Sequence, residues 1–134
     1  MVRHKIIAYT PINTSAMTYS VTDEVGTTKY WDIPRLWEES KQLQIESKNL
    51  SNYSLVLKGP LTWCSPQVPM SFQGFLDHMT QTLNAELSYP ILLDKDGNVI
   101  DGMHRLAKAF LSHQKTILVK QFKEELSPDR VTYS

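Results

Sequence analysis

The sequence has one cysteine, Cys64, among its 134 residues. A single cysteine forms neither an internal disulfide nor a zinc cluster, and its scarcity fits a reducing compartment. Neither sign of charge is in excess, because Lys plus Arg and Asp plus Glu both number 14. No global positive field is therefore available to drive general binding to nucleic acid, and we expect no strong DNA binding.

Long hydrophobic runs are also absent. The stretch Ile6–Ala8 is too short for the core of a signal peptide, and no run approaches the length of a membrane span. We therefore expect a cytoplasmic protein with no membrane partner. The length suits a single domain, residues 1–134, and the 41% hydrophobic and 21% charged residues are typical of a globular chain.

The first half of the chain gives weak structural signals. The segment Thr10–Lys29 is rich in Thr and Ser without periodicity, which predicts an irregular region within the poorly assigned residues 1–30. A helix is expected to start at Asp32 and Pro34 and to end near Lys41. The alternation in 43–45 predicts a short strand, the apolar run 55–57 stops at Gly59, and Trp63 and Cys64 fall in a proline-rich loop.

The second half is clearer. Helical spacing of Phe72, Phe75, Leu76, Met79, Leu83 and Leu87 predicts an amphipathic helix that starts at Ser71 and whose hydrophobic side must pack against another surface. A buried strand is expected at 89–93, a turn at 94–97, a returning strand at 98–100, a helix from Met103 to about Ser112, a strand at 116–122 and a polar tail at 123–134.

The densest group of polar residues lies between the returning strand and its helix, in Asp101-Gly102-Met103-His104-Arg105. A glycine at a helix start leaves free backbone N–H groups that can hold a phosphate. Arg105 adds a charged fork, and His104 can donate a hydrogen bond or move a proton. An aspartate at the cap would stand where a phosphate goes, so both fit only if Asp101 turns aside toward a metal ion or a substrate hydroxyl.

A structural interpretation of the same five residues is available. Asp101 can be a helix cap, Gly102 a turn residue, Arg105 an ion-pair partner and His104 a solvated side chain. Alternatives also stand elsewhere. His78 could reach the site or be structural, Trp63 could stack on a base or pack in the core, and Lys108 could contact phosphate or face solvent. Asp94 and Asp96 suit a turn better than a magnesium site, and Cys64 suits an inert thiol better than a nucleophile.

Residues 89–109, from Tyr89-Pro90-Ile91 through Asp96-Gly97 and Asp101-Gly102-Met103-His104-Arg105 to Ala109, resemble the nucleotide-binding core of the ParB/sulfiredoxin superfamily. In that superfamily a hairpin leads into a helix whose start binds nucleotide phosphates. The resemblance implies an α+β fold, a small mixed sheet with packed helices, in which residues 89–122 form the core. It implies ATP or another nucleoside triphosphate with Mg²⁺ as cofactors.

Departures from the known branches narrow the function. Sulfiredoxins carry a cysteine before the His-Arg pair, where this chain has Met103, so sulfiredoxin chemistry is not expected. Partition proteins have two arginines at the positions of His104 and Arg105 and continue into DNA-binding and dimerisation regions, which we do not expect here. The remaining pattern is more similar to free serine kinases, which use this fold for phosphoryl transfer.

The leading hypothesis is therefore a kinase-like phosphotransferase that acts on an unidentified small molecule, or a nucleotide hydrolase. Asp101 would be metal ligand or general base, and His104 a phosphate donor or acid. Gly102, Met103, His104, Arg105 and Lys108 would bind the nucleotide. The alternatives are a non-catalytic nucleotide-sensing or protein-interaction module and, more remotely, a nuclease. The sequence leaves the oligomeric state open.

Overall fold

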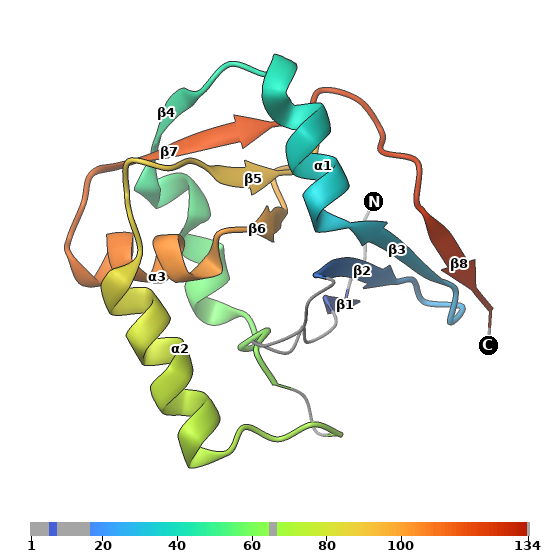
Figure 1. Cartoon of the computed structure of the whole chain (residues 1–134), viewed down its shortest axis with the longest axis horizontal. Coiled ribbons are helices and arrows are strands. Elements are labelled where there is room, and N and C mark those ends of the chain that lie inside the picture. The colour runs from blue at the N-terminus through green and yellow to red at the C-terminus, as the bar shows by residue number, and fades with distance from the viewer. Residues whose placement is uncertain (1–5, 8–16, 65–66, 134) are drawn as a thin grey trace.

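The computed structural model describes residues 6–7, 17–64 and 67–133. The fold is mixed α/β, of the α+β kind, as the sequence predicted. Figure 1 shows two sheets with helices packed around the second of them. One sheet has the strand order β1-β2-β3-β8, and the other has the order β4-β7-β5-β6. The strands of the first sheet are β1 (Ile6–Ile7), β2 (Thr18–Thr22), β3 (Thr28–Asp32) and β8 (Arg130–Thr132).

The second sheet consists of β4 (Glu46–Asn49), β5 (Ile91–Leu93), β6 (Val99–Asp101) and β7 (Thr116–Gln121). Its central strands β5 and β7 are parallel, and both outer pairs are antiparallel. The helices are α1 (Ile33–Glu39), α2 (Phe72–Asn84) and α3 (Met103–Leu111), with 3₁₀ segments η1 (Ser40–Gln42) and η2 (Leu50–Lys58).

Strand β5 separates two hydrophobic clusters. Ile91 and Leu93 face a cluster formed with α3, β7 and η2, whereas Leu92 faces a cluster formed with α1 and the first sheet. All three side chains are fully buried, because successive residues of a strand point to opposite faces and one of these clusters covers each face. The continuous apolar run that predicted a buried strand thus holds both layers together.

The turn between β5 and β6 has the predicted chemistry. Asp94 Oδ1 accepts hydrogen bonds from the backbone N–H groups of Asp96 and Asn98, both at 2.9 Å. Gly97 takes a φ of +86°, a conformation that glycine adopts without strain. The Asp94 carboxylate therefore stabilises the turn, the role that turn chemistry favoured over metal binding.

Several expectations for the weaker segments were wrong. Strand β2 and the start of β3 lie in the region predicted to be irregular, and β8 lies in the predicted polar tail. The predicted strand at 43–45 is displaced to β4. Each of these strands is only three to five residues long, and β4 and β8 pair with strands far away in the sequence, β7 and β3. Residues 8–16 of the predicted irregular segment lie outside the described residues.

Candidate functional site

A cavity of about 680 Å³ opens where α3 begins. Its walls come from the end of β6, the first turn of α3, one side of α2 and the loop that precedes α2. The volume falls within the usual range for small-molecule sites. The polar and aromatic side chains on its wall include Trp63, His78, Asp101, His104 and Arg105, and the wall also includes Glu86 and Tyr89.

The backbone at Gly102 sets the geometry of this cavity. Gly102 is the N-cap of α3 and has a φ of +110°. A Cβ at this position would lie 2.6 Å from Cγ2 of Ile91, so the start of α3 packs directly against β5. The first intrahelical bond is donated by Leu106 to the carbonyl of Gly102. The N–H groups of Met103, His104 and Arg105 precede it and have no acceptor within the helix.

Asp101 turns away from the start of α3. Its Oδ2 accepts a hydrogen bond from the indole N–H of Trp37 at 2.7 Å, and its Oδ1 accepts one from the backbone N–H of Gly102 at 2.9 Å. The carboxylate is thus not the cap of the first turn. The conflict between an aspartate cap and a bound anion is absent in this arrangement, and Trp37 is the residue that removes it.

Arg105 lines the cavity with a fixed guanidinium. Its Nη1 donates to the carbonyl of Pro90 at 2.6 Å, and its Cζ lies 5.8 Å from the ring centroid of Trp37. This bond uses one of the five N–H donors of the group. The ion pair with Asp101 that the structural interpretation expected is not among the salt bridges of the described residues.

Two histidines and a tryptophan form the opposite wall. His78 Nδ1 and His104 Nε2 share a hydrogen bond at 2.8 Å, although the residues come from different helices. Trp63 stacks on both rings, with centroid distances of 4.2 Å to His78 and 4.7 Å to His104. The sequence offered His78 and Trp63 only as alternatives, because their contribution depends on how α2 and its preceding loop pack against α3.

Both histidines are neutral near pH 7. Burial, together with the nearby His78 and Arg105 and against the opposing effect of Asp101, lowers the pKa of His104 to about 4. Burial also lowers the pKa of His78. A neutral imidazole pair can donate one proton and accept another, which suits proton transfer or recognition of a polar ligand.

Lys108 lies apart from this group. Its Nζ donates to the carbonyls of Leu83 at 3.0 Å and Ala85 at 2.8 Å, at the C-terminal end of α2. It is not part of the cavity wall. The lysine joins α2 to α3 and places a positive charge at the negative end of α2.

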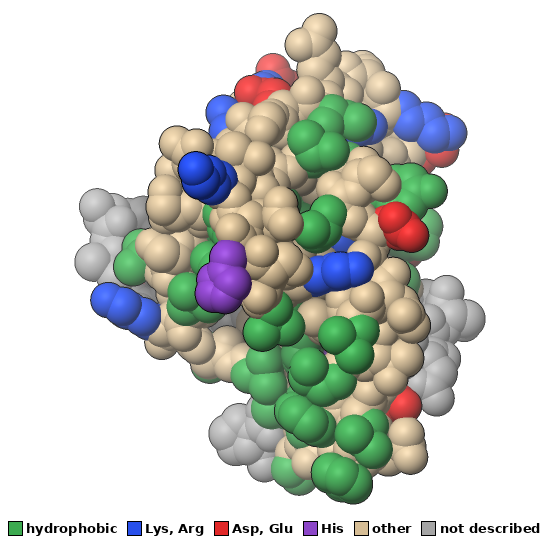
Figure 2. Space-filling model, turned by 90° about the vertical axis from the view of Figure 1, so that its left-hand side faces the viewer, with side chains coloured by type: hydrophobic (Ala, Val, Ile, Leu, Met, Phe, Trp, Pro, Cys, Tyr) green, Lys and Arg blue, Asp and Glu red, His purple; other side chains and the backbone are tan. Residues whose placement is uncertain are grey.

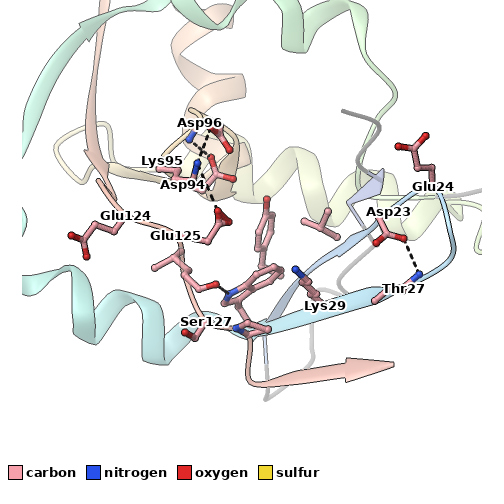
Figure 3. Close-up of a pocket in the computed structure, with 15 residues that line it drawn as sticks. Asp23, Glu24, Thr27, Lys29, Asp94, Lys95, Asp96, Glu124, Glu125 and Ser127 are labelled. Atoms are coloured by element: carbon pink, nitrogen blue, oxygen red, sulfur yellow. Dashed lines mark hydrogen bonds and ion pairs between the residues drawn. The ribbon is translucent and has the colours of Figure 1, made fainter. Parts of the chain in front are cut away.

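A second cavity, of about 550 Å³, lies between the first sheet and the β5–β6 turn (Figure 3). Two lysines line it, and Lys95 forms ion pairs with Asp96 and Glu125. Its carboxylates belong to Asp23, Glu24, Asp94, Asp96, Glu124 and Glu125. This excess of negative charge disfavours phosphate, so the cavity at α3 is the better anion site.

The donor set at α3 can contribute only part of a magnesium site. Within 6–7, 17–64 and 67–133 there is no group of three or more His, Cys, Asp or Glu side chains that could hold a metal ion. Mg²⁺ bound with a nucleotide needs only one or two carboxylates besides the phosphates. Asp101 fits as one such ligand, since each of its oxygens accepts one hydrogen bond and keeps a second lone pair.

Comparisons with protein-family models, with curated proteins and with solved structures found no match for this chain. No helix in the described part of the chain is long and apolar enough to cross a membrane.

Proposed function

We propose that the cavity at the start of α3 binds a nucleoside triphosphate with Mg²⁺ and that the protein transfers its terminal phosphoryl group to a small molecule or to water. The observation that carries the proposal is the combination, in one cavity, of an uncapped helix start and an arginine. Backbone N–H groups at a positive helix end and a guanidinium are the donors that phosphates favour.

The rest of the cavity suits the remainder of a nucleotide. Trp63 is half-buried and belongs to the wall, so an aromatic face is present for a base. The two neutral histidines keep this wall uncharged, and they supply hydrogen bonds to a hydroxyl or a base. The volume accommodates a ligand of this size.

Each residue then has a role in the chemistry. The N–H groups of Met103 and His104 and the guanidinium of Arg105 hold the phosphates and stabilise charge that develops on them. Asp101 is the carboxylate that would bind Mg²⁺, which supplies neutralisation of phosphate charge when it is bound. His104, neutral at pH 7 and engaged by His78 at Nε2, would donate a hydrogen bond from its other ring nitrogen to a phosphate oxygen.

A non-catalytic nucleotide sensor is the second candidate. Both oxygens of Asp101 already accept hydrogen bonds, and His104 Nε2 is engaged by His78. Groups held in this way favour binding over proton transfer. Product formation over time from ATP and Mg²⁺ separates the two functions.

The test is isothermal titration calorimetry with ATP and other nucleoside triphosphates, with and without Mg²⁺. Arg105→Ala should weaken binding about ten- to a hundredfold, because a charge-assisted phosphate contact is worth roughly 1.5–3 kcal/mol. Arg130→Ala is the matched control, since it removes the same charge from the exposed strand β8, where the guanidinium lies over the Tyr30 ring. Circular dichroism melting checks that both variants are folded. Equal affinity in wild type and Arg105→Ala would remove Arg105 from the site, and no nucleotide binding by wild type would reject the function.

A further inference from the structure

Helix α2 turns its polar side inward and its hydrophobic side outward. His78 and Thr82 are 2% and 1% exposed, and Thr82 Oγ1 donates to the carbonyl of His78. Phe72 and Leu83 on the other side are 77% and 67% exposed. The spacing predicted that this hydrophobic side packs against another surface, without saying which. The contacts of His78 with Trp63 and His104 turn the polar side of the helix toward the core, so the hydrophobic side faces outward.

The outward side forms a continuous surface. Figure 2 shows hydrophobic side chains gathered over the lower part of the molecule, where α2 lies. The residues of α2 that contribute are Phe72, Phe75, Leu76, Met79 and Leu83. A continuous hydrophobic patch on one helix often marks an interaction surface.

The spacing of the hydrophobic residues on this surface indicates that its partner is a second helix. Phe72, Leu76, Met79 and Leu83 follow each other at intervals of four, three and four residues, which is the seam of a two-helix coiled coil. The order of intervals is the same in both directions. The seam is therefore complementary to itself when a second helix runs antiparallel, as a two-fold axis requires.

Charge and area both permit a second copy. Asp77 is the one acidic residue of α2, which has no lysine or arginine, so two seams meet without repulsion between charged residues. Covering the five side chains removes on the order of 400 Å² per copy. With the apolar fraction of about 65% usual in homodimers, the total interface is about 1,200 Å². This is the lower end of the range for specific interfaces, so the dimer should dissociate on dilution.

We propose that α2 is a self-association surface on which α2 of a second copy packs antiparallel. Phe72 then meets Leu83 of the second copy, and Leu76 meets Met79. The wall of the nucleotide cavity lies on the opposite side of α2, where His78 is buried, so this proposal is independent of the proposed function.

Sedimentation velocity of the full chain, from about 1 µM to about 500 µM, tests the proposal. Wild type should shift from monomer to dimer over this range. Phe72→Lys and Leu83→Glu should each weaken association at least about tenfold, because each places an unpaired charge in the seam. The double variant Phe72→Lys/Leu83→Glu should recover dimer, since the antiparallel arrangement brings the new charges of opposite sign together.

Val25→Lys is the matched control, because Val25 is 77% exposed in the β2–β3 turn and far from α2 in Figure 1. It should associate like wild type. Leu83→Ala adds no charge and should weaken association less than Leu83→Glu does, which keeps the test valid if a charged variant is poorly folded by circular dichroism. A wild type that stays monomeric throughout, or single variants that associate unchanged, would overturn the proposal. A double variant that stays monomeric would overturn the antiparallel arrangement.

Discussion

Replacing Gly102 by alanine should destabilise the protein more than the equivalent change at another glycine of positive φ. At Gly102 the φ is +110°, and the added methyl group would lie 2.6 Å from Cγ2 and 2.9 Å from Cβ of Ile91. Ile91 is fully buried in β5, so a shift of its side chain would disturb the packing of the core around it. Backbone strain in the left-handed region costs about 1–2 kcal/mol, and overpacking of a core costs about 1–3 kcal/mol more.

Gly97→Ala provides the comparison. Its φ of +86° gives a similar strain, but a Cβ there has no heavy atom within 4 Å. We therefore expect a loss of about 1–2 kcal/mol for Gly97→Ala and about 2–5 kcal/mol for Gly102→Ala. The larger loss is a substantial part of the 5–15 kcal/mol that stabilises a typical domain.

Urea unfolding followed by tryptophan fluorescence measures both losses on the same scale. The slope of the unfolding free energy against urea concentration should be the same in wild type and both variants, so that a shift of the midpoint measures the change in stability. If both variants lose the same free energy, the close packing of α3 on β5 is refuted, and with it the reason that the helix start is held open at the cavity.

Three further outcomes follow from the same contacts. Because the pKa of His104 is about 4 in the folded protein and 6.5 ordinarily, the unfolded chain takes up the proton first, and stability should fall as the pH decreases from about 6.5 to 4. His104→Asn should reduce this acid-induced loss of stability by on the order of 1–2 kcal/mol. Melting temperatures of wild type and variant across this pH range measure the difference, and an identical pH profile in the variant would contradict the assignment to His104. Lys108→Met keeps the aliphatic chain but loses both hydrogen bonds to carbonyls at the end of α2. The free energy of unfolding in urea should therefore fall by about 1–2 kcal/mol, while calorimetry shows unchanged nucleotide affinity. Weaker nucleotide binding would instead place Lys108 in the phosphate site. Trp37→Phe frees Asp101 Oδ2, so the carboxylate can compete for the start of α3, and nucleotide affinity should fall severalfold by calorimetry; equal affinity would show that Trp37 does not hold the site open.

The segment from β5 to α3 was predictable because its signals are local. A buried apolar run, an aspartate turn and a glycine before an amphipathic helix each act within a few residues, and the observed elements follow in that order. The same signals brought Asp101, Gly102, Met103, His104 and Arg105 to one cavity wall. Local chemistry therefore predicted that these five residues lie together.

The rest depends on contacts between distant parts of the chain. Helical spacing shows that α2 has two different sides, but the contact of His78 with His104, 26 residues away, decides which side is buried. The first sheet depends on β8, which pairs with β3 from the other end of the sequence. The position of Lys108 depends on the C-terminal end of α2. No periodicity within a single segment reports these pairings.

The central claim is that nucleotide phosphates bind at the first turn of α3. Amide chemical shifts of the ¹⁵N-labelled protein, followed during titration with ATP and Mg²⁺, test it directly. We expect the largest shifts at the N–H groups of Met103, His104 and Arg105 and at the indole N–H of Trp37, with little change at Asp23 or Glu24 in the acidic cavity. Shifts confined to the acidic cavity, or no shifts at millimolar ATP, would contradict the account.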